Sequence, residues 1–163
     1  TNTVYLRIGY EFDFPENHYS PGPYKNAFRY IVDRLRSSRI NNAVMVWHSW
    51  SFEPWQGHSI EDWYPGDEYV DVCGISIFQQ PLWNQYNHLN EMIHFAQDHK
   101  KPVVICESTP FGGILHDAQG QSPPKDGASW SSWFRPVLSY IEQHDIRGFS
   151  YINCAWDDQL MWR

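Results

Sequence analysis

The chain has 163 residues, of which 42% are hydrophobic and 17% aromatic, so it can form a domain with a real core, and intrinsic disorder is excluded. A formal net charge of −7 argues against nucleic acid as a partner, because proteins that bind it usually carry a basic surface. No apolar run approaches the roughly 20 residues of a membrane span, so we expect no membrane partner and a single domain over residues 1–163.

Apolar periodicity alternates between strand and helix along the chain. In chain order the predicted elements are a strand at 4–12, a helix around 27–35, a strand at 42–47, a long Trp-containing loop at 48–66, a strand at 70–78, a helix around 89–96, a strand at 101–108, a Gly-rich loop at 109–127, a helix around 130–141 and a strand at 146–153. This alternation predicts an α/β fold in which helices cover a parallel sheet.

The spacing of the strands favours one such fold. Strand centres follow one another at intervals of roughly 30 to 45 residues, and a (β/α)8 TIM barrel averages about 31 residues per unit. We therefore predict about five βα units of a barrel that needs eight when closed. An open doubly wound sheet is the competing fold, but its Gly-rich phosphate turn is missing after the first strand, where the sequence is FDFPENHYSPGP.

Two predicted strands end on a glutamate. Glu107 closes the apolar run that begins at Val103, and Glu11 closes the run that begins at Val4. A carboxylate beside such a run rarely lacks a partner or a task, because ionised groups are costly to desolvate. Since barrel enzymes place their chemistry at the carboxyl ends of the strands, we expect both glutamates at the mouth of the barrel.

Strand parity predicts which way each side chain faces. Alternation places Glu107 on the same face as Val103 and Ile105, and we expect this face to be the barrel interior. Val104 and Cys106 are then expected to face the helices. By the same alternation Arg7 and Gly9 share the face of Glu11, so Arg7 is a candidate donor for Glu107.

The carboxylate pair points to sugar chemistry. Two carboxylates about 5 to 5.5 Å apart suit retaining glycoside hydrolysis, in which one is the nucleophile and the other the acid and then the base. The many aromatic residues suit stacking on sugar rings. The chain has no G-x-S-x-G, H-E-x-x-H or P-loop motif, so serine hydrolases, zincins and NTPases lose their usual sequence support.

At this point the sequence resembles a known family. The segments LRIGYEFD, NNAVMVWHS, YPGDEYVDVCGISIF and KPVVICEST resemble barrel strands 4 to 7 of the clan A retaining glycoside hydrolases, closest to family 26, which includes β-mannanases and β-1,3-xylanases. The resemblance covers nearly the whole chain as the C-terminal five-eighths of the barrel, strands 4 to 8. It implies Glu11 as acid/base, Glu107 as nucleophile, and cleavage of a β-linked plant or algal polysaccharide such as mannan, xylan or glucan. We also expect secretion, no cofactor and no metal, and the long aromatic loops favour an open groove and endo cleavage.

Seven further residues are candidates for contact with the polysaccharide or oligosaccharide substrate: Arg7, Tyr10, Trp47, His48, Trp50, Phe78 and Trp156. Two of them depart from the usual family pattern. Tyr10 stands where the family usually has His or Asn before the acid/base, and Phe78 stands where it often has a Tyr that orients the nucleophile.

Other readings of the same residues stay open. The chain is alternatively a non-catalytic carbohydrate-binding barrel remnant, a part of a longer glycosidase, or a barrel enzyme that uses the acidic pair to abstract a proton. Because the first and last predicted strands have open edges, we also expect association through those edges if no further strands cover them.

Overall fold

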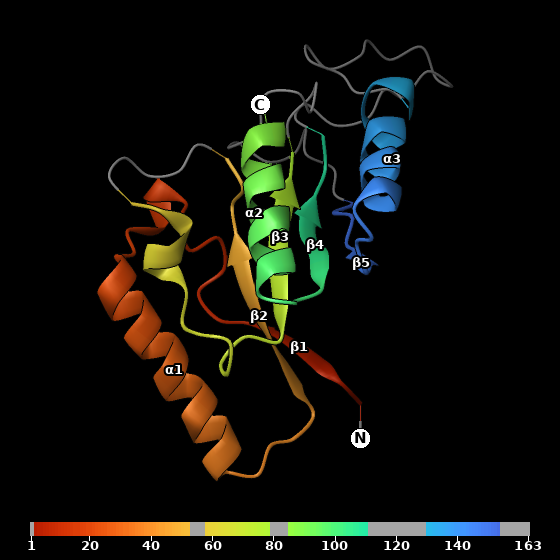
Figure 1. Ribbon diagram of the computed structural model, residues 1–163. Coiled ribbons are helices and arrows are strands. Elements are labelled where there is room, and N and C mark those ends of the chain that lie inside the picture. Colours follow the sequence, from red (N-terminus) through yellow and green to blue (C-terminus); the bar gives the residue numbers. More distant parts are fainter. Residues whose placement is uncertain (1, 53–57, 79–84, 111–129, 154–163) are drawn as a thin grey trace.

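The computed structural model describes residues 2–52, 58–78, 85–110 and 130–153. Helices and strands alternate as predicted (Figure 1). The elements are β1 (Val4–Arg7), a 3-10 turn (Pro15–Asn17), α1 (Pro21–Ser37), β2 (Ala43–Ser49), a 3-10 turn (Ile60–Trp63), β3 (Val72–Ile77), α2 (Tyr86–Asp98), β4 (Val103–Ser108), a π-helical turn (Trp130–Phe134), α3 (Arg135–Gln143) and β5 (Gly148–Phe149).

The strands form one parallel sheet in the order β1-β2-β3-β4-β5, so each strand pairs with its neighbour in sequence. The sheet curls, and the helices lie along its outer side (Figure 1). Sequential parallel strands with helices outside are the arrangement of a TIM barrel, here present in part. The predicted fold class is confirmed.

The core fills the space between the sheet and the helices. It takes Trp47 from β2, Ile75 from β3 and Ile105 from β4, which pack with apolar residues of all three helices. On α1 the buried side chains are Tyr24, Phe28 and Val32, spaced four residues apart on one face. The opposite face of the sheet is open and hollow, with Arg7, Val46, Val72, Val104 and Cys106 among its lining residues.

The first and last strands are shorter than predicted. β1 stops at Arg7, and Gly9 and Glu11 beyond it have left-handed backbones with φ of 57° and 47°. A left-handed residue cannot continue a pleated ladder, so the chain turns away from the sheet before Glu11. β5 covers only Gly148–Phe149.

The parity prediction for β4 was wrong for the residues before Glu107, and a β-bulge turns Glu107 itself to the predicted face. Val103 and Ile105 lie in the core on the helix side, whereas Val104 and Cys106 line the open inner face. The register shifts between Ile75 and Ser76, so that Ile75 pairs with Ile105 but Ser76 pairs with Glu107. Cys106 is therefore the extra residue of the bulge. An extra residue reverses the alternation beyond it, which turns Glu107 to the inner face.

Candidate active site

Glu107 lies on the inner face beside a cation. Its Oε1 forms an ion pair with Nη1 of Arg7, which reaches across from the last residue of β1. The two side chains are 23% and 36% exposed, so the pair is partly open to solvent. A contact between a guanidinium and a carboxylate is charge-assisted, which makes it stronger than a hydrogen bond between neutral groups.

Glu11 reaches the site from an irregular turn rather than from a strand. Gly9 allows the turn for two reasons. Its φ is positive, and a Cβ at this position would lie only 2.8 Å from the Tyr24 ring. Tyr24 Oη in turn donates to the Ile8 carbonyl at 3.0 Å. Glu11 itself adopts a left-handed backbone with φ of 47°, which is uncommon for a residue other than glycine.

Several contacts hold this uncommon backbone. The Glu11 carbonyl accepts hydrogen bonds from Asn17 Nδ2 at 3.0 Å and from the Phe14 N–H at 2.9 Å. The next residue, Phe12, donates its N–H to the His48 carbonyl at 3.0 Å and stacks on Trp47 with ring centroids 4.4 Å apart. A strained backbone persists only where its surroundings hold it in place. Here these contacts hold the Glu11 backbone and thereby fix the direction of its side chain.

The Glu11 carboxyl group is buried, and its pKa is raised. The residue is 7% exposed, and Ser76 Oγ donates to its Oε1 at 2.6 Å. Burial raises the pKa of Glu11 to about 7, the Ser76 hydrogen bond opposes this shift, and the negative charge of Glu107 adds to it. A carboxyl group with a pKa near 7 can donate a proton at neutral pH and accept one in a later step.

His48 stands behind Ser76. It is fully buried, its Nε2 lies 2.9 Å from Ser76 Oγ, and its Nδ1 lies 3.4 Å from Arg7 Nη1. Burial, with a smaller effect of the Arg7 charge, lowers the pKa of His48 to about 3, so the ring is neutral. Having no exposed surface, His48 acts on the site through its neighbours, in place of the direct sugar contact that we predicted.

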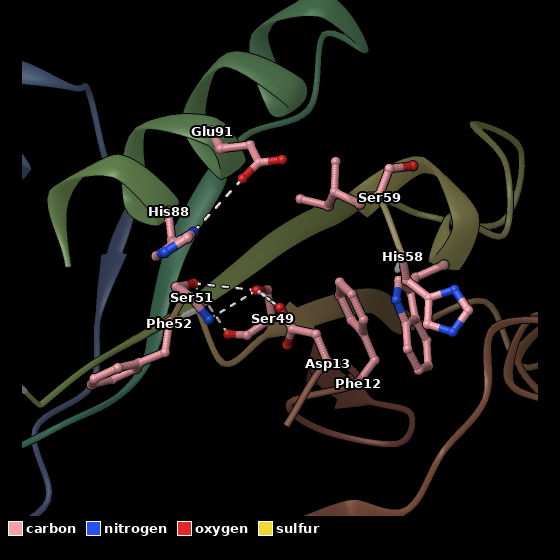
Figure 2. Close-up of a pocket in the computed structure, with 11 residues that line it drawn as sticks. Phe12, Asp13, Ser49, Ser51, Phe52, His58, Ser59, His88 and Glu91 are labelled. Carbon is pink, nitrogen blue, oxygen red and sulfur yellow. Dashed lines mark hydrogen bonds and ion pairs between the residues drawn. The ribbon is translucent and has the colours of Figure 1, made fainter. Parts of the chain in front are cut away.

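A second acidic residue fastens the turn to β2. Asp13 is partly buried and accepts hydrogen bonds from Ser49 Oγ and from the Trp50 N–H, both at 2.6 Å. Figure 2 shows Asp13 and Ser49 in a small pocket beside the turn, with His88 and Glu91 of α2 across it. Burial raises the pKa of Asp13. This carboxyl group bridges the turn that carries Glu11 and the end of β2.

The aromatic candidates differ in how accessible they are. Tyr10 is 47% exposed beside Arg7, and Trp50 is partly exposed, so both remain available for sugar contact. Trp47 was misjudged: it is fully buried on the helix side of the sheet, where a sugar cannot reach it. Phe78, directly after β3, is 6% exposed. Trp156 lies outside the described residues.

Sequence reasoning missed Ser76, which joins both halves of the site. Its hydroxyl contacts Glu11 and its backbone pairs with Glu107. The available signal was a lone hydroxyl residue in the apolar strand VDVCGISIF, since a buried polar side chain needs a partner. Within the described ranges, no three His, Cys, Asp or Glu side chains cluster in a way that could hold a metal ion, and no helix is long and apolar enough to cross a membrane.

Similar proteins were found by sequence. The chain is 34% identical to a β-1,3-xylanase of Alcaligenes sp and 35% identical to one of Vibrio sp, each over 98% of this chain and 36% and 37% of the relatives. It is 36% identical to a mannan endo-1,4-β-mannosidase of Thermothelomyces thermophilus over 58% of this chain and 18% of that protein. The chain thus spans about a third of the length of the first two relatives.

Solved structures show the same fold. A modular endo-β-1,4-mannanase of Cellulomonas fimi superposes with a TM-score of 0.67 at 21% identity, over 93% of this chain and 35% of that one. The catalytic domain of a Bacillus sp. family 26 endo-β-1,4-mannanase gives 0.67 at 20% identity, over 91% and 40%. A family model of glycosyl hydrolase family 26 matches residues 10–156. The chain belongs to glycosyl hydrolase family 26.

Proposed function

We propose that this chain carries the two catalytic carboxylates of a retaining β-glycanase. The observation that carries the proposal is the contrast between two nearby carboxyl groups on the inner face. Glu11 is buried with a pKa of about 7, while Glu107 is paired with Arg7. An acid that holds its proton beside an ionised carboxylate is the pair that double displacement requires.

The two groups act in turn. A Glu107 oxygen attacks the anomeric carbon and forms an ester bond while the glycosidic C–O bond breaks, and the departing oxygen takes the Glu11 proton. Ionised Glu11 then removes a proton from water, whose oxygen attacks the same carbon and displaces Glu107. Each displacement inverts the carbon, so the product keeps the β configuration.

The relatives support a first choice of substrate. The two relatives that match over 98% of this chain are named β-1,3-xylanases, whereas the mannosidase matches over 58%. We therefore propose β-1,3-xylan as the substrate and β-1,4-mannan as the second choice. Endo cleavage is part of this proposal, because Tyr10 is exposed and Trp50 partly exposed, so both aromatic rings can contact a polymer. Since such polymers lie outside cells, we also propose an extracellular protein.

The test is sugar release by the complete protein as its gene encodes it. Reducing ends are measured on soluble β-1,3-xylan, β-1,4-mannan and mixed-linkage glucan, with Glu107→Gln and Glu11→Gln as controls. We expect release mainly from β-1,3-xylan and almost none from either variant. Proton NMR during the first minutes identifies the anomer formed, and β product is expected.

Other results have definite meanings. An initial α anomer would contradict retention. Release that both variants keep would exclude the two glutamates as the catalytic pair. Binding of xylan without release by the unmodified protein would favour a non-catalytic carbohydrate-binding protein.

A further inference from the structure

A continuous chain of side-chain contacts connects the two carboxylates. It runs from Glu107 to Arg7, from Arg7 to His48 Nδ1, from His48 Nε2 to Ser76 Oγ, and from Ser76 to Glu11 Oε1. We propose that Ser76 and His48 are positioning residues that determine which oxygen of Glu11 delivers the proton. This inference rests on the proposed function.

The hydrogen atoms in this chain can be assigned from donor capacity alone. Arg7 has only N–H donors, so His48 Nδ1 must be the acceptor of their contact at 3.4 Å. A neutral imidazole with an accepting Nδ1 carries its hydrogen on Nε2, which therefore donates to Ser76 Oγ at 2.9 Å.

The same reasoning fixes the last contact. The Ser76 hydroxyl has one hydrogen, and with its oxygen already accepting from His48 this hydrogen points to Glu11 Oε1 at 2.6 Å. In each of these three contacts the hydrogen thus points away from Arg7 and toward Glu11. Arg7 sets this direction, and it also holds Glu107.

The consequence is an assignment of roles to the two Glu11 oxygens. Oε1 is occupied as a hydrogen-bond acceptor, so the acidic proton of neutral Glu11 resides on Oε2. When the glycosidic bond breaks, the Oε2–H bond breaks with it and the leaving oxygen takes that proton. A carboxyl group held in one rotamer with its proton on a defined oxygen is already oriented for transfer.

The surroundings keep Ser76 and His48 in place. Both are fully buried, and Gln85 Nε2 donates to the Ser76 carbonyl at 2.8 Å. Gly74 pairs with His48 in the sheet and lacks a Cβ, which would lie 3.1 Å from His48 Cβ. The register shift that turns Glu107 inward begins at Ser76. The sheet itself therefore fixes the spacing between these two residues and the carboxylates.

The test separates proton delivery from general damage by changing the leaving group. Ser76→Ala is made in the complete protein, and kcat/KM is measured on β-1,3-xylan, whose leaving oxygen needs a proton, and on dinitrophenyl β-1,3-xylobioside, whose leaving group does not. General acid catalysis contributes about 10²- to 10⁴-fold. We expect Ser76→Ala to lose about tenfold or more on xylan and under about threefold on the aryl glycoside.

Three further variants complete the design. Ser76→Thr keeps the hydroxyl and should restore activity on xylan. His48→Phe keeps a planar ring without Nε2 and should show the same selectivity for the aryl substrate at smaller amplitude. Ser108→Ala is the matched control. The Ser108 hydroxyl is as buried as that of Ser76, but it donates to the Ser150 carbonyl at 2.6 Å and takes no part in the contacts between Arg7 and Glu11. This variant should lower stability without changing the ratio of the two substrates.

The outcomes distinguish the inference from the function on which it rests. If Ser76→Ala loses the same factor on both substrates, as Ser108→Ala does, Ser76 is merely structural and the inference fails. The proposed function survives that result as long as Glu11→Ala still shows the aryl-selective pattern. If Glu11→Ala keeps its activity on xylan, both fail together.

Discussion

Glu107 and Glu11 differ in the backbone that carries them and in the surroundings of their carboxyl groups. Glu107 belongs to β4, a regular strand with one bulge, and it is partly exposed beside Arg7. Glu11 follows a strand that has already ended, on a left-handed backbone, and its buried carboxyl group accepts from the neutral hydroxyl of Ser76. One carboxyl group lies in an ion pair with Arg7, and burial raises the pKa of the other. Because both residues are glutamates, the proposed roles of acid/base and nucleophile rest on the different surroundings of the two carboxyl groups.

The largest expected effect comes from removing each carboxyl group, and azide can then replace the missing group. Glu107→Ala should lose at least about 10⁴-fold on xylan, because the covalent intermediate cannot form, while Glu11→Ala should lose about 10²- to 10⁴-fold. Azide should rescue both on dinitrophenyl β-1,3-xylobioside, with opposite products. NMR should identify an α-azide from Glu107→Ala and a β-azide from Glu11→Ala.

These products report which group is the nucleophile. Azide replaces the missing Glu107 from the face that this residue occupies, which inverts the carbon. In Glu11→Ala the glycosyl-enzyme forms normally, and azide attacks it in a second inversion. Exchange of the two products between the variants would reverse the assigned roles.

The next effect concerns stability, and its sign follows from the Glu11 pKa. The pKa of about 7 in the folded protein exceeds the ordinary glutamate value of 4.5, so the folded protein binds more protons than the unfolded one between these two pH values. The Glu11 contribution to stability is fully present below about pH 4.5 and is lost as pH rises through about 7. Glu11→Gln removes this loss and should stabilise the protein at pH 8 by up to about 3 kcal/mol.

Urea unfolding of both proteins at pH 5 and pH 8 measures this difference. The two free energies of unfolding should be close at pH 5 and should separate at pH 8. Glu107→Gln is the control: it breaks the ion pair with Arg7 but leaves the buried acid in place, so the dependence on pH should persist. A Glu11→Gln protein that is no more stable at pH 8 would contradict the burial argument.

The sequence predicted the fold because its signals are repeated along the chain. Each βα unit carries its own apolar strand and amphipathic helix, so an error in one unit does not change the architecture. Parity within β4 could not be predicted, because one bulge reverses every side chain beyond it, and nothing in VVICES indicates the register shift opposite Ser76. Glu107 was nevertheless placed on the correct face, because two errors cancelled: the wrong inner face for Val103 and the missed bulge.

The site was predictable where the chemistry belongs to one residue. Glu11 and Glu107 stand out as acids after apolar runs, and Arg7 as a cation in a strand. The partnership of Ser76 and His48 depends on register across neighbouring strands, which a single sequence does not display. Trp47 was misassigned for a different reason: it precedes His48 in β2, and alternation along the strand turns it to the face opposite that of His48.

A smaller effect is expected from Asp13, whose carboxyl group connects the Glu11 turn to the end of β2. Asp13→Asn cannot accept both bonds from Ser49 and Trp50 as a carboxylate does, and about 2 kcal/mol of stability should be lost. Activity on xylan should fall as well, because the turn orients Glu11. Asp71→Asn is the matched control: Asp71 Oδ2 accepts the Met45 N–H at 2.8 Å near the start of β2, away from the site. It should lower stability while kcat stays unchanged.

An effect of similar size tests the Glu107 side, through the bulge that turns this residue inward. A Cβ at Gly74 would lie 2.6 Å from Sγ of Cys106, the bulge residue, so Gly74→Ala must displace the Cys106 side chain or the strand that carries it. Overpacking of this kind costs about 1 to 3 kcal/mol. Cys106→Ala removes the blocking sulfur, and the double variant should recover part of the stability and the activity on xylan. A double-mutant cycle measures this coupling. If the two effects simply add, the contact between Gly74 and Cys106 does not set the position of the bulge, and the orientation of Glu107 depends on Arg7 instead.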